Sequence, residues 1–293
     1  MSAYRLIEAE KASYPISVLC RVLKVSRSGY YDWKGRPPSK RDQESAALTQ
    51  KIREVHNRSR RTYYGYPRVH AELKALGVRC SRKRVARLMS KAGLWGCIRG
   101  RRKRTTRRDL YTTPAPDLLK RNFTAAAPNK IWTADITYIN TWEGFLYLAF
   151  ILDIYSRRVV GWSMATHLRS ELVVDALEMA LWRRNPDVGL IHHTDRGAQY
   201  TALSFGKKLE EAGIVASMGR VGSALDNAIS ESFVASLKCE LLHGHRFIDR
   251  EAARTAVFDY IEGFYNRVRR HSSLGYLSPS EYEQATIKEV ATA

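Results

Sequence analysis

Three carboxylates in the second half of the chain have a type and spacing that would let them act together on one substrate. Asp195 ends a short apolar run, and Gly197 interrupts the pattern two residues later. A buried strand that ends in an acid delivers it to the rim of a sheet, where ligands bind in open α/β folds. Asp135 lies in a strand-like run, residues 131–139, and Glu231 lies in a helix-like run with 35 residues between it and Asp195. These local patterns allow all three acids to point toward one place.

Carboxylates grouped in this way are suited to holding divalent metal for chemistry on a phosphodiester. Two Mg²⁺ ions about 3.5–4 Å apart activate the attacking oxygen, neutralise the phosphoryl charge and assist the leaving oxygen. Mg²⁺ uses few protein oxygens, so three acids suffice, and we expect Mn²⁺ to be able to replace it. Without metal the carboxylates would repel one another and at least one pKa would rise, which predicts a poorly ordered site. The alternative is that each acid is structural or simply exposed.

A histidine-held zinc site is a less favoured interpretation of the same stretch. His192 and His193 directly precede Thr194 and Asp195. Adjacent residues of a strand face opposite sides of the sheet. At most one of the two imidazoles could therefore join Asp195.

The run around Glu231, residues 225–242, has the period of an amphipathic helix. Positions i, i+4 and i+11 fall on one face of such a helix, and they are occupied by Asn227, Glu231 and Lys238. The opposite, apolar stripe consists of Ile229, Phe233 and Leu237. Glu231 can thus face a cleft while the back of its helix packs on the core.

The elements that must position these acids predict an α/β fold. Three strand-like runs come first, with Trp142-Glu-Gly as the first turn, and they are followed by helix, strand, helix and strand. The expected ranges are 131–139, 145–154, 158–165, 170–185, the strand before Asp195, 204–212 and 214–217. This is the order of a ribonuclease-H-like core, a mixed five-stranded sheet with flanking helices. A final helix, 249–268, and a loop, 272–280, follow it.

The positive charge of the chain is confined to its first half. Residues 1–124 hold 31 Lys/Arg against 9 Asp/Glu, a net of +22, whereas residues 125–293 hold 18 against 20, a net of −2. Residues 79–108 contain 13 basic side chains and no acid. Such a block repels itself unless a polyanion neutralises it, and DNA or RNA is the obvious partner. A solvated basic face remains the alternative. Acidic lipid is less favoured, because no apolar anchor accompanies the charge.

The first half is predicted to be all helical. Residues 15–23 place Ile16, Leu19, Val22 and Leu23 on one face, and residues 28–33 can begin a second short helix. The clearer helix-turn-helix spans 42–95, with Ala47, Ile52 and Val55 among the apolar positions of its first helix. Pro67 suits the first turn of the next helix, and Gly77 its end.

The last helix of this region, 82–92, is capped by Ser81, is closed by Gly93 and has the composition of a recognition helix. Its candidate DNA-contacting residues are Arg82, Lys83, Arg84, Arg87 and Lys91. The stretch 97–113 has almost no apolar residues and is expected to become ordered only on phosphate. Its candidate contacts include Arg101, Arg102, Lys103 and Arg104. A generic basic helical bundle is the alternative.

We therefore expect five segments. They are an N-terminal helix-turn-helix-like segment 1–36, a helix-turn-helix DNA-binding domain 42–95, a basic arm and linker 96–124, a catalytic core 125–243, and a C-terminal helix and tail 244–293. No signal peptide or membrane-spanning run is visible. The four scattered cysteines support neither a zinc site nor a disulfide framework, and this fits a reduced cytoplasm.

Long motifs are spread over almost the whole chain. They are Trp132-Thr-Ala-Asp-Ile-Thr-Tyr, Leu152-Asp-Ile-Tyr-Ser-Arg-Arg-Val-Val-Gly-Trp, His193-Thr-Asp-Arg-Gly-Ala-Gln-Tyr, Asp226-Asn-Ala-Ile-Ser-Glu-Ser-Phe, Leu237-Lys-Cys-Glu and Tyr265-Asn-Arg-Val-Arg-Arg-His-Ser-Ser-Leu. In this order they resemble the OrfB part of the IS-three family of bacterial insertion-sequence transposases, which have an integrase-type DDE core. Upstream, Tyr64-Gly-Tyr-Pro-Arg and the basic helix resemble that family's helix-turn-helix.

The resemblance implies that Asp135, Asp195 and Glu231 are the catalytic triad and hold the metal. Lys238, seven residues after the glutamate, matches the basic residue that contacts DNA in the family, and we place Asn227 on the same side. Unlike retroviral integrases, the chain begins with no His/Cys zinc module. The family's complete enzyme usually fuses an upstream frame to this one by ribosomal frameshifting, so the resemblance implies that this chain is the catalytic portion of such an enzyme.

The expected activity is metal-dependent cleavage at insertion-sequence ends, followed by direct attack of the released 3′-hydroxyl on another phosphodiester. Both steps are in-line phosphoryl transfers with no covalent protein–DNA link. Expected partners are the element's terminal inverted repeats, target DNA, further copies of the chain on DNA and the upstream-frame protein, in the bacterial cytoplasm at the nucleoid. Two rivals are a non-catalytic regulator of its own element and a structure-specific nuclease of the same fold.

Overall fold

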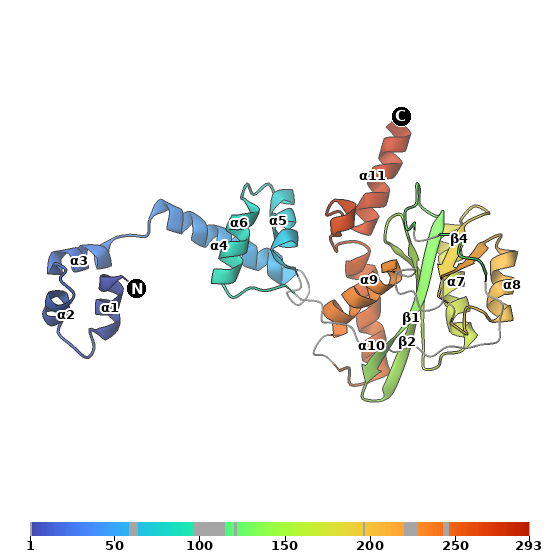
Figure 1. The fold of residues 1–293 in the computed structure, drawn as a ribbon, viewed down its shortest axis with the longest axis horizontal. Coiled ribbons are helices and arrows are strands. Elements are labelled where there is room, and N and C mark those ends of the chain that lie inside the picture. The colour runs from blue at the N-terminus through green and yellow to red at the C-terminus, as the bar shows by residue number, and fades with distance from the viewer. Residues whose placement is uncertain are drawn as a thin grey trace.

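A computed structural model of the chain describes residues 2–58, 64–96, 115–119, 122–195, 197–219, 228–242 and 246–292, with side chains up to residue 287 in the last range. At the N-terminal end three short helices, α1 (Ala3–Glu10), α2 (Ile16–Val22) and α3 (Arg27–Gly35), enclose a small core of their own (Figure 1). Its buried members are Ile7, Cys20 and Tyr30. The expected inner position of Val22 is wrong, because its side chain is 71% exposed.

The next three helices form the predicted helix-turn-helix region. They are α4 (Lys40–Arg58), α5 (Tyr66–Ala75) and α6 (Arg82–Lys91). The end signals of α6 are confirmed: the Ser81 hydroxyl accepts a hydrogen bond from the Arg84 N–H at 3.2 Å, and Gly93 has a positive φ. On α4 the predicted apolar positions Ile52 and Val55 are buried, whereas Ala47 is exposed and Leu48 is buried in its place.

The catalytic half contains a mixed five-stranded sheet, as predicted. Its strands are β1 (Ile131–Thr141), β2 (Gly144–Asp153), β3 (Val159–Ala165), β4 (Ile191–Thr194) and β5 (Val215–Met218), in the order β3-β2-β1-β4-β5. The first three strands are antiparallel neighbours, whereas β4 pairs in parallel with β1 and β5.

Helices cover both faces of the sheet (Figure 1). One face carries α7 (Ser170–Arg184) and α8 (Leu203–Glu211), and the other carries α9 (Ala228–Leu237) and α10 (Arg250–Phe258). The approach of α7 to β3 requires a glycine: a Cβ at Gly161 would lie 2.2 Å from the Ala176 carbonyl oxygen. The packing therefore depends on one missing side chain.

Two helices continue as π-helical segments, which the sequence pattern does not predict. α9 passes into Lys238–Leu242, and α10 passes into Asp259–Tyr265. A π-helical turn inserts an extra residue per turn and so shifts the angular position of everything after it. The expected face shared by positions i and i+11 from Asn227 therefore cannot be continued unchanged past Leu237.

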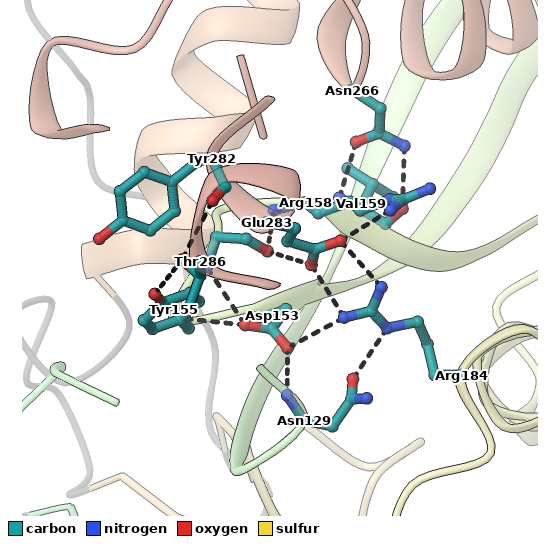
Figure 2. Close-up of polar contacts among 11 residues, drawn as sticks. Asn129, Asp153, Tyr155, Arg158, Val159, Arg184, Asn266, Tyr282, Glu283 and Thr286 are labelled. Atoms are coloured by element: carbon teal, nitrogen blue, oxygen red, sulfur yellow. Dashed lines mark hydrogen bonds and ion pairs between the residues drawn. The ribbon is translucent and has the colours of Figure 1, made fainter. Parts of the chain in front are cut away.

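A C-terminal helix, α11 (Pro279–Thr292), replaces the expected tail and is anchored through Glu283. Arg184 donates to both Glu283 oxygens, at 3.0 and 2.8 Å, and Arg158 and Ser156 donate at 2.7 and 2.8 Å (Figure 2). The buried Asp153 lies beside this cluster and accepts the Asn129 N–H at 2.7 Å. Burial acts to raise the pKa of Glu283, but the hydrogen bonds and charges of its two arginines outweigh it and hold that pKa below the usual value.

Two buried histidines make the fold sensitive to acid. Burial, with His193 nearby, lowers the pKa of His192 to about 3, and burial together with neighbouring arginines lowers that of His271 to about 2. Below about pH 6.5, the ordinary pKa of histidine in the unfolded chain, the unfolded chain binds protons that the folded chain does not bind. The free energy of unfolding therefore decreases as the pH is lowered. Between pH 7 and 5 we expect the free energy of unfolding to fall by about 2 kcal/mol per histidine.

Urea unfolding at the two pH values measures this loss. His192→Asn should remove about half of the pH dependence, because asparagine does not titrate. Equal stability at pH 7 and 5 in the unmodified chain would contradict the prediction.

The thiols only partly match the expectation from spacing. Cys20 and Cys80 are free, but Cys239 is disulfide-bonded. Disulfide formation depends on distance in space, which scattered positions in the sequence do not reveal. In the part of the chain that the structure covers, no helix combines the length and the hydropathy needed to cross a membrane.

Candidate active site

Asp135 and Asp195 are brought together by parallel pairing of β1 and β4. The register pairs Thr133 with His193, and each acid follows two residues later, Asp195 one residue beyond the end of β4. Neighbouring strands lie about 4.7–4.9 Å apart. The pairing of β1 with β4 therefore brings together the segments that carry these two acids, which are separated by 59 residues in the sequence.

A buried tyrosine marks the space near both acids. The Tyr200 side chain is 5% exposed, its ring packs 5.5 Å from that of Phe205, and its hydroxyl makes no hydrogen bond within the described residues. Burial, followed by the negative charges of Asp135 and Asp195, raises the pKa of Tyr200 well above its usual value. Both carboxylates thus act on the same hydroxyl.

Local backbone contacts hold the two aspartates. The Asp135 Oδ1 atom accepts the N–H of Ile136 at 2.8 Å, and the Asp195 Oδ1 atom accepts the N–H of Gly197 at 3.0 Å. Surrounding protein atoms raise the pKa of Asp195 through desolvation, although part of the side chain is exposed, and the Gly197 N–H opposes that rise. A carboxylate that is costly to charge gains more from a nearby cation.

Gly197 also leaves room for this arrangement. A Cβ at position 197 would lie 3.1 Å from the Asp195 Oδ1 atom. The break in the sequence pattern thus marks a close approach of backbone to carboxylate.

Glu231 lies on α9 as predicted, with its helix attached to β1 beside the aspartates. The Ser230 hydroxyl lies 2.9 Å from that of Thr133, which is two residues before Asp135 on the same strand. On the same, sheet-facing side of α9, the Phe233 ring packs 4.5 Å from that of Phe150 on β2. The apolar stripe of Ile229, Phe233 and Leu237 is buried, which confirms the predicted orientation of the helix.

The structure does not assemble the three acids into one metal-binding cluster. Within the described ranges, no group of three or more His, Cys, Asp or Glu side chains is arranged to hold a metal ion. Asp135, Asp195 and Glu231 therefore do not form one set of metal ligands in this structure.

Both histidines of the motif have packing roles. The His193 Nδ1 atom lies 2.9 Å from the Ser217 hydroxyl, and its ring packs 6.0 Å from that of Phe123. The His192 ring packs 5.4 Å from Phe205. Strand alternation sends the two rings to opposite faces of the sheet.

The predicted DNA-contacting residues differ in their surroundings. Lys238 is exposed, and its Nζ atom lies 4.7 Å from the ring centroid of Tyr138. On α6, Arg84 is bound within the protein, with Glu44 at 3.7 Å and the Ser45 hydroxyl at 3.4 Å. Arg82 contacts the ring of Tyr276. The exposed cations of α6 that remain are Lys83, Arg87 and Lys91. Asn227, Arg101, Arg102, Lys103 and Arg104 lie outside the described residues.

Two groups of residues lie within the long motifs without a role predicted from sequence. One is Tyr200, which closes the motif around Asp195. The other is the buried pair of Glu240 and Arg269, whose guanidinium donates to the carboxylate at 2.6 and 2.7 Å. The available signal for that pair was the presence of an acid and a base in two of the long motifs, Leu237-Lys-Cys-Glu and Tyr265-Asn-Arg-Val-Arg-Arg-His.

Profiles of known protein families match the segments of the chain that carry these features. Two family profiles described as integrase core domain match residues 125–224 and 212–279, and one described as HTH-like domain matches residues 42–103. The chain is 41% identical to the transposase InsF for insertion sequence IS3A of Escherichia coli (strain K12), over 97% of this chain and 99% of the relative. It is 43% identical to an uncharacterized 31 kDa protein of insertion element IS600 from Shigella sonnei, over 91% and 97%.

Solved structures with similarity to this chain include a simian T-cell lymphotropic virus intasome in complex with PP2A regulatory subunit B56 gamma. Its TM-score is 0.46 at 15% identity, over 73% of this chain and 69% of that chain. Another is the HTLV-2 integrase catalytic core domain in complex with magnesium, with a TM-score of 0.40 at 18% identity, over 54% and 98%.

Proposed function

This chain belongs to the family of insertion-sequence transposases that includes InsF of IS3, and we propose that it cuts and joins DNA at the ends of its own element with Asp135, Asp195 and Glu231. The observation that carries the proposal is that parallel pairing of β1 with β4 brings together the segments that hold the two aspartates, whose charges both act on the buried Tyr200 hydroxyl. Two carboxylates whose charges act on the same buried hydroxyl favour a nearby cation, because like charges repel one another.

The donor set supports magnesium. Asp135 and Asp195 offer carboxylate oxygens, which Mg²⁺ prefers, and Glu231 would complete the set from α9. When bound, two Mg²⁺ ions, or Mn²⁺ in their place, would activate the attacking oxygen and neutralise charge on the phosphoryl group. The backbone contacts of the two aspartates would keep their other oxygens directed at the site.

The chain's own residues would bring DNA to these acids. The exposed cations Lys83, Arg87 and Lys91 on α6 would contact phosphates, and Lys238 beside α9 would hold the strand near the cut. In the first step a water oxygen bonds to phosphorus and the 3′ oxygen leaves as a hydroxyl. In the second step that hydroxyl attacks another phosphodiester and displaces its 3′ oxygen. The first step thus replaces a P–O ester bond by a P–OH group, and the second replaces one P–O ester bond by another.

The decisive experiment is a strand-transfer assay with the full chain, Mg²⁺ and an end-labelled duplex that carries one terminal repeat of the element. Joined product supports the proposal. Cleavage without joining would indicate the nuclease alternative, and tight binding without either product would indicate the regulator. Adding the upstream-frame protein, or fusing it, tests whether it is a required partner. Size measurement of the DNA complex tests for an oligomer.

Binding through α6 predicts a strong salt dependence. The affinity of the full chain for this duplex should fall steeply between 50 and 200 mM salt, on the order of 10³-fold or more, because bound phosphates release counterions. Replacing Lys83, Arg87 and Lys91 by alanine should reduce the slope by about one for each phosphate that is no longer bound. Fluorescence anisotropy at several salt concentrations measures it, with Lys207→Ala on the distant helix α8 as control. An unchanged slope in the triple variant would remove α6 from the DNA interface.

A further inference from the structure

Three of the long motifs meet at one place that the proposed chemistry does not use. They are Tyr64-Gly-Tyr-Pro-Arg before and within α5, Leu237-Lys-Cys-Glu at the end of α9, and Tyr265-Asn-Arg-Val-Arg-Arg-His after α10. Side chains of the first motif contact both of the others. We call this set of contacts the joint, because it connects the helix-turn-helix region to the catalytic half.

The α5 side of the joint bonds directly to main-chain atoms of the catalytic half. The Tyr64 hydroxyl accepts the N–H of Arg270 at 3.0 Å and donates to the carbonyl of Val268 at 3.4 Å. The Arg68 Nε atom donates to the carbonyl of Arg270 at 3.0 Å. The Tyr64 ring, 2% exposed, packs 6.3 Å from that of Phe264. Bonds to backbone fix a position more firmly than contacts between mobile side-chain ends.

Two ion pairs cross the joint. The Arg270 guanidinium binds both oxygens of Glu72 on α5, at 2.6 and 3.2 Å, in a bidentate geometry that restricts orientation. The Arg68 Nη1 atom lies 3.5 Å from the Glu240 Oε1 atom. Both side chains of the first pair are partly exposed, Glu72 at 24% and Arg270 at 14%, whereas the second pair joins Arg68, 25% exposed, to the buried Glu240, 5% exposed. The first pair thus lies at the rim of the joint, and the second connects its rim to its interior.

The joint reaches the helix that carries a catalytic acid. Glu240 accepts the Tyr260 hydroxyl at 2.8 Å and two nitrogens of Arg269 at 2.6 and 2.7 Å. Arg269 also donates a hydrogen bond to the Ser236 hydroxyl at 3.1 Å. Ser236 lies one turn before Glu240, on α9, the helix that carries Glu231. Movement of α5 would disturb these contacts, which hold α9 and its π-helical extension.

The recognition helix is held by the same side of the catalytic half. Arg82, its first residue, donates to the Tyr276 hydroxyl at 3.3 Å, and its guanidinium lies 5.7 Å from the ring centroid. The Tyr276 carbonyl in turn accepts a hydrogen bond from the Arg270 Nη1 atom at 2.8 Å. Both α5 and α6 are therefore tied to one segment, residues 268–276.

We propose that the joint determines which phosphodiester is cut, by fixing the distance between the DNA bound at α6 and the acids Asp135, Asp195 and Glu231. The inference rests on the proposed function and adds a positioning role for Arg68, Glu72, Glu240 and Arg270. A reacting group must be placed to within about 1 Å for efficient reaction. A DNA-binding domain on a free tether would present many phosphates in turn, whereas a domain locked to the catalytic helix presents one.

Charge reversal at the rim tests the proposal without emptying the core. The variants are Glu72→Arg, Arg270→Glu and the double variant that exchanges the two charges. Glu54→Arg makes the same charge change at an exposed position of α4 and serves as the matched control. Tyr64→Phe removes the bridging hydroxyl and keeps the ring, so it tests the joint with little risk to folding.

Two measurements are made on each full-length variant. The first is the distance distribution between dyes on unnatural amino acids at the exposed positions Lys51 of α4 and Lys207 of α8, by single-molecule fluorescence transfer. The second is the cut position, mapped at nucleotide resolution on an end-labelled duplex that carries one end of the element, in Mg²⁺, together with the Kd for that duplex.

We expect one narrow distance and one cut position for the unmodified chain and for Glu54→Arg. Glu72→Arg and Arg270→Glu should broaden the distance distribution, spread the cuts over neighbouring phosphates and reduce the main product at least tenfold, with Kd within threefold of Glu54→Arg. Tyr64→Phe should shift both readouts in the same direction by less. The double variant should restore at least half of the main product and narrow the distribution.

An unchanged cut position in the single variants would overturn the proposal, and so would a broadened distance with cutting still confined to one phosphate. Failure of the double variant to restore either readout would show that the pairing is not what matters, and would overturn it as well. If the unmodified chain makes no cut, the proposed function fails, while the distance measurement still tests the joint itself.

Discussion

Asp135→Asn is expected to abolish Mg²⁺-dependent cleavage while leaving DNA binding intact. Asparagine keeps the size of the side chain and its backbone contact but removes the negative charge that would hold the cation beside Asp195. Loss of a metal-holding carboxylate costs several kcal/mol of transition-state stabilisation, and each 1.36 kcal/mol is tenfold in rate, so we expect a decrease of about 10³-fold or more. Single-turnover cleavage of the end-labelled duplex measures the rate.

The matched control is Asp175→Asn, the same chemical change at an exposed position of α7. It should cleave at the unmodified rate, and both variants should bind the duplex with a Kd within twofold of the unmodified chain. Cleavage by Asp135→Asn within tenfold of the control would remove Asp135 from the catalytic set. Loss of binding in that variant would mean that the substitution disturbs the fold.

Glu240→Gln is expected to lower the free energy of unfolding by about 3–5 kcal/mol, because it leaves the Arg269 charge uncompensated in the interior. Arg269 is 2% exposed, and two of its nitrogens donate hydrogen bonds to the Glu240 carboxylate. Burial acts to raise the pKa of Glu240, but Arg269, with smaller help from Arg68 and Tyr260, holds that pKa below its usual value. The carboxylate is therefore charged at neutral pH. Its replacement by neutral glutamine leaves the buried arginine without a compensating negative charge, which destabilises the folded state.

Urea unfolding at pH 7 provides the measurement, with Glu211→Gln on the exposed face of α8 as the control for loss of one carboxylate. The control should change stability by less than about 0.5 kcal/mol. A loss below about 1 kcal/mol in Glu240→Gln would mean that the pair is solvated in practice and does not hold α9 to the segment after α10.

The sequence alone predicted most of the secondary structure, because those signals are local. Ser81 and Gly93 bound α6, and runs rich in aromatic and β-branched residues predict β1, β2 and β3 within a few positions. The composition of neighbouring residues sets capping, turn formation and strand propensity without reference to distant segments. Position in the motifs also singled out Asp135, Asp195 and Glu231 as the acids to follow.

Local signals misjudged positions whose environment comes from elsewhere in the chain. Val22 has the helical spacing of an inner position, yet its side chain is 71% exposed. The sequence of α11 shows a weak amphipathic pattern. Hydrogen bonds from Arg184 and Arg158 to the Glu283 carboxylate anchor this helix. Arg82 and Arg84 have the composition of DNA contacts, yet both engage partners within the protein.

Residue types and order thus determined which elements form and which acids are candidates, since both follow from near neighbours. Only the tertiary structure decided what those residues meet. The parallel register of β1 with β4 brings Asp135 to Asp195, and the packing of α5 on the catalytic half joins Glu240 to Arg68. Contacts of this kind form when distant segments are brought together by burial of the shared core, and their partners leave no periodic trace in the sequence.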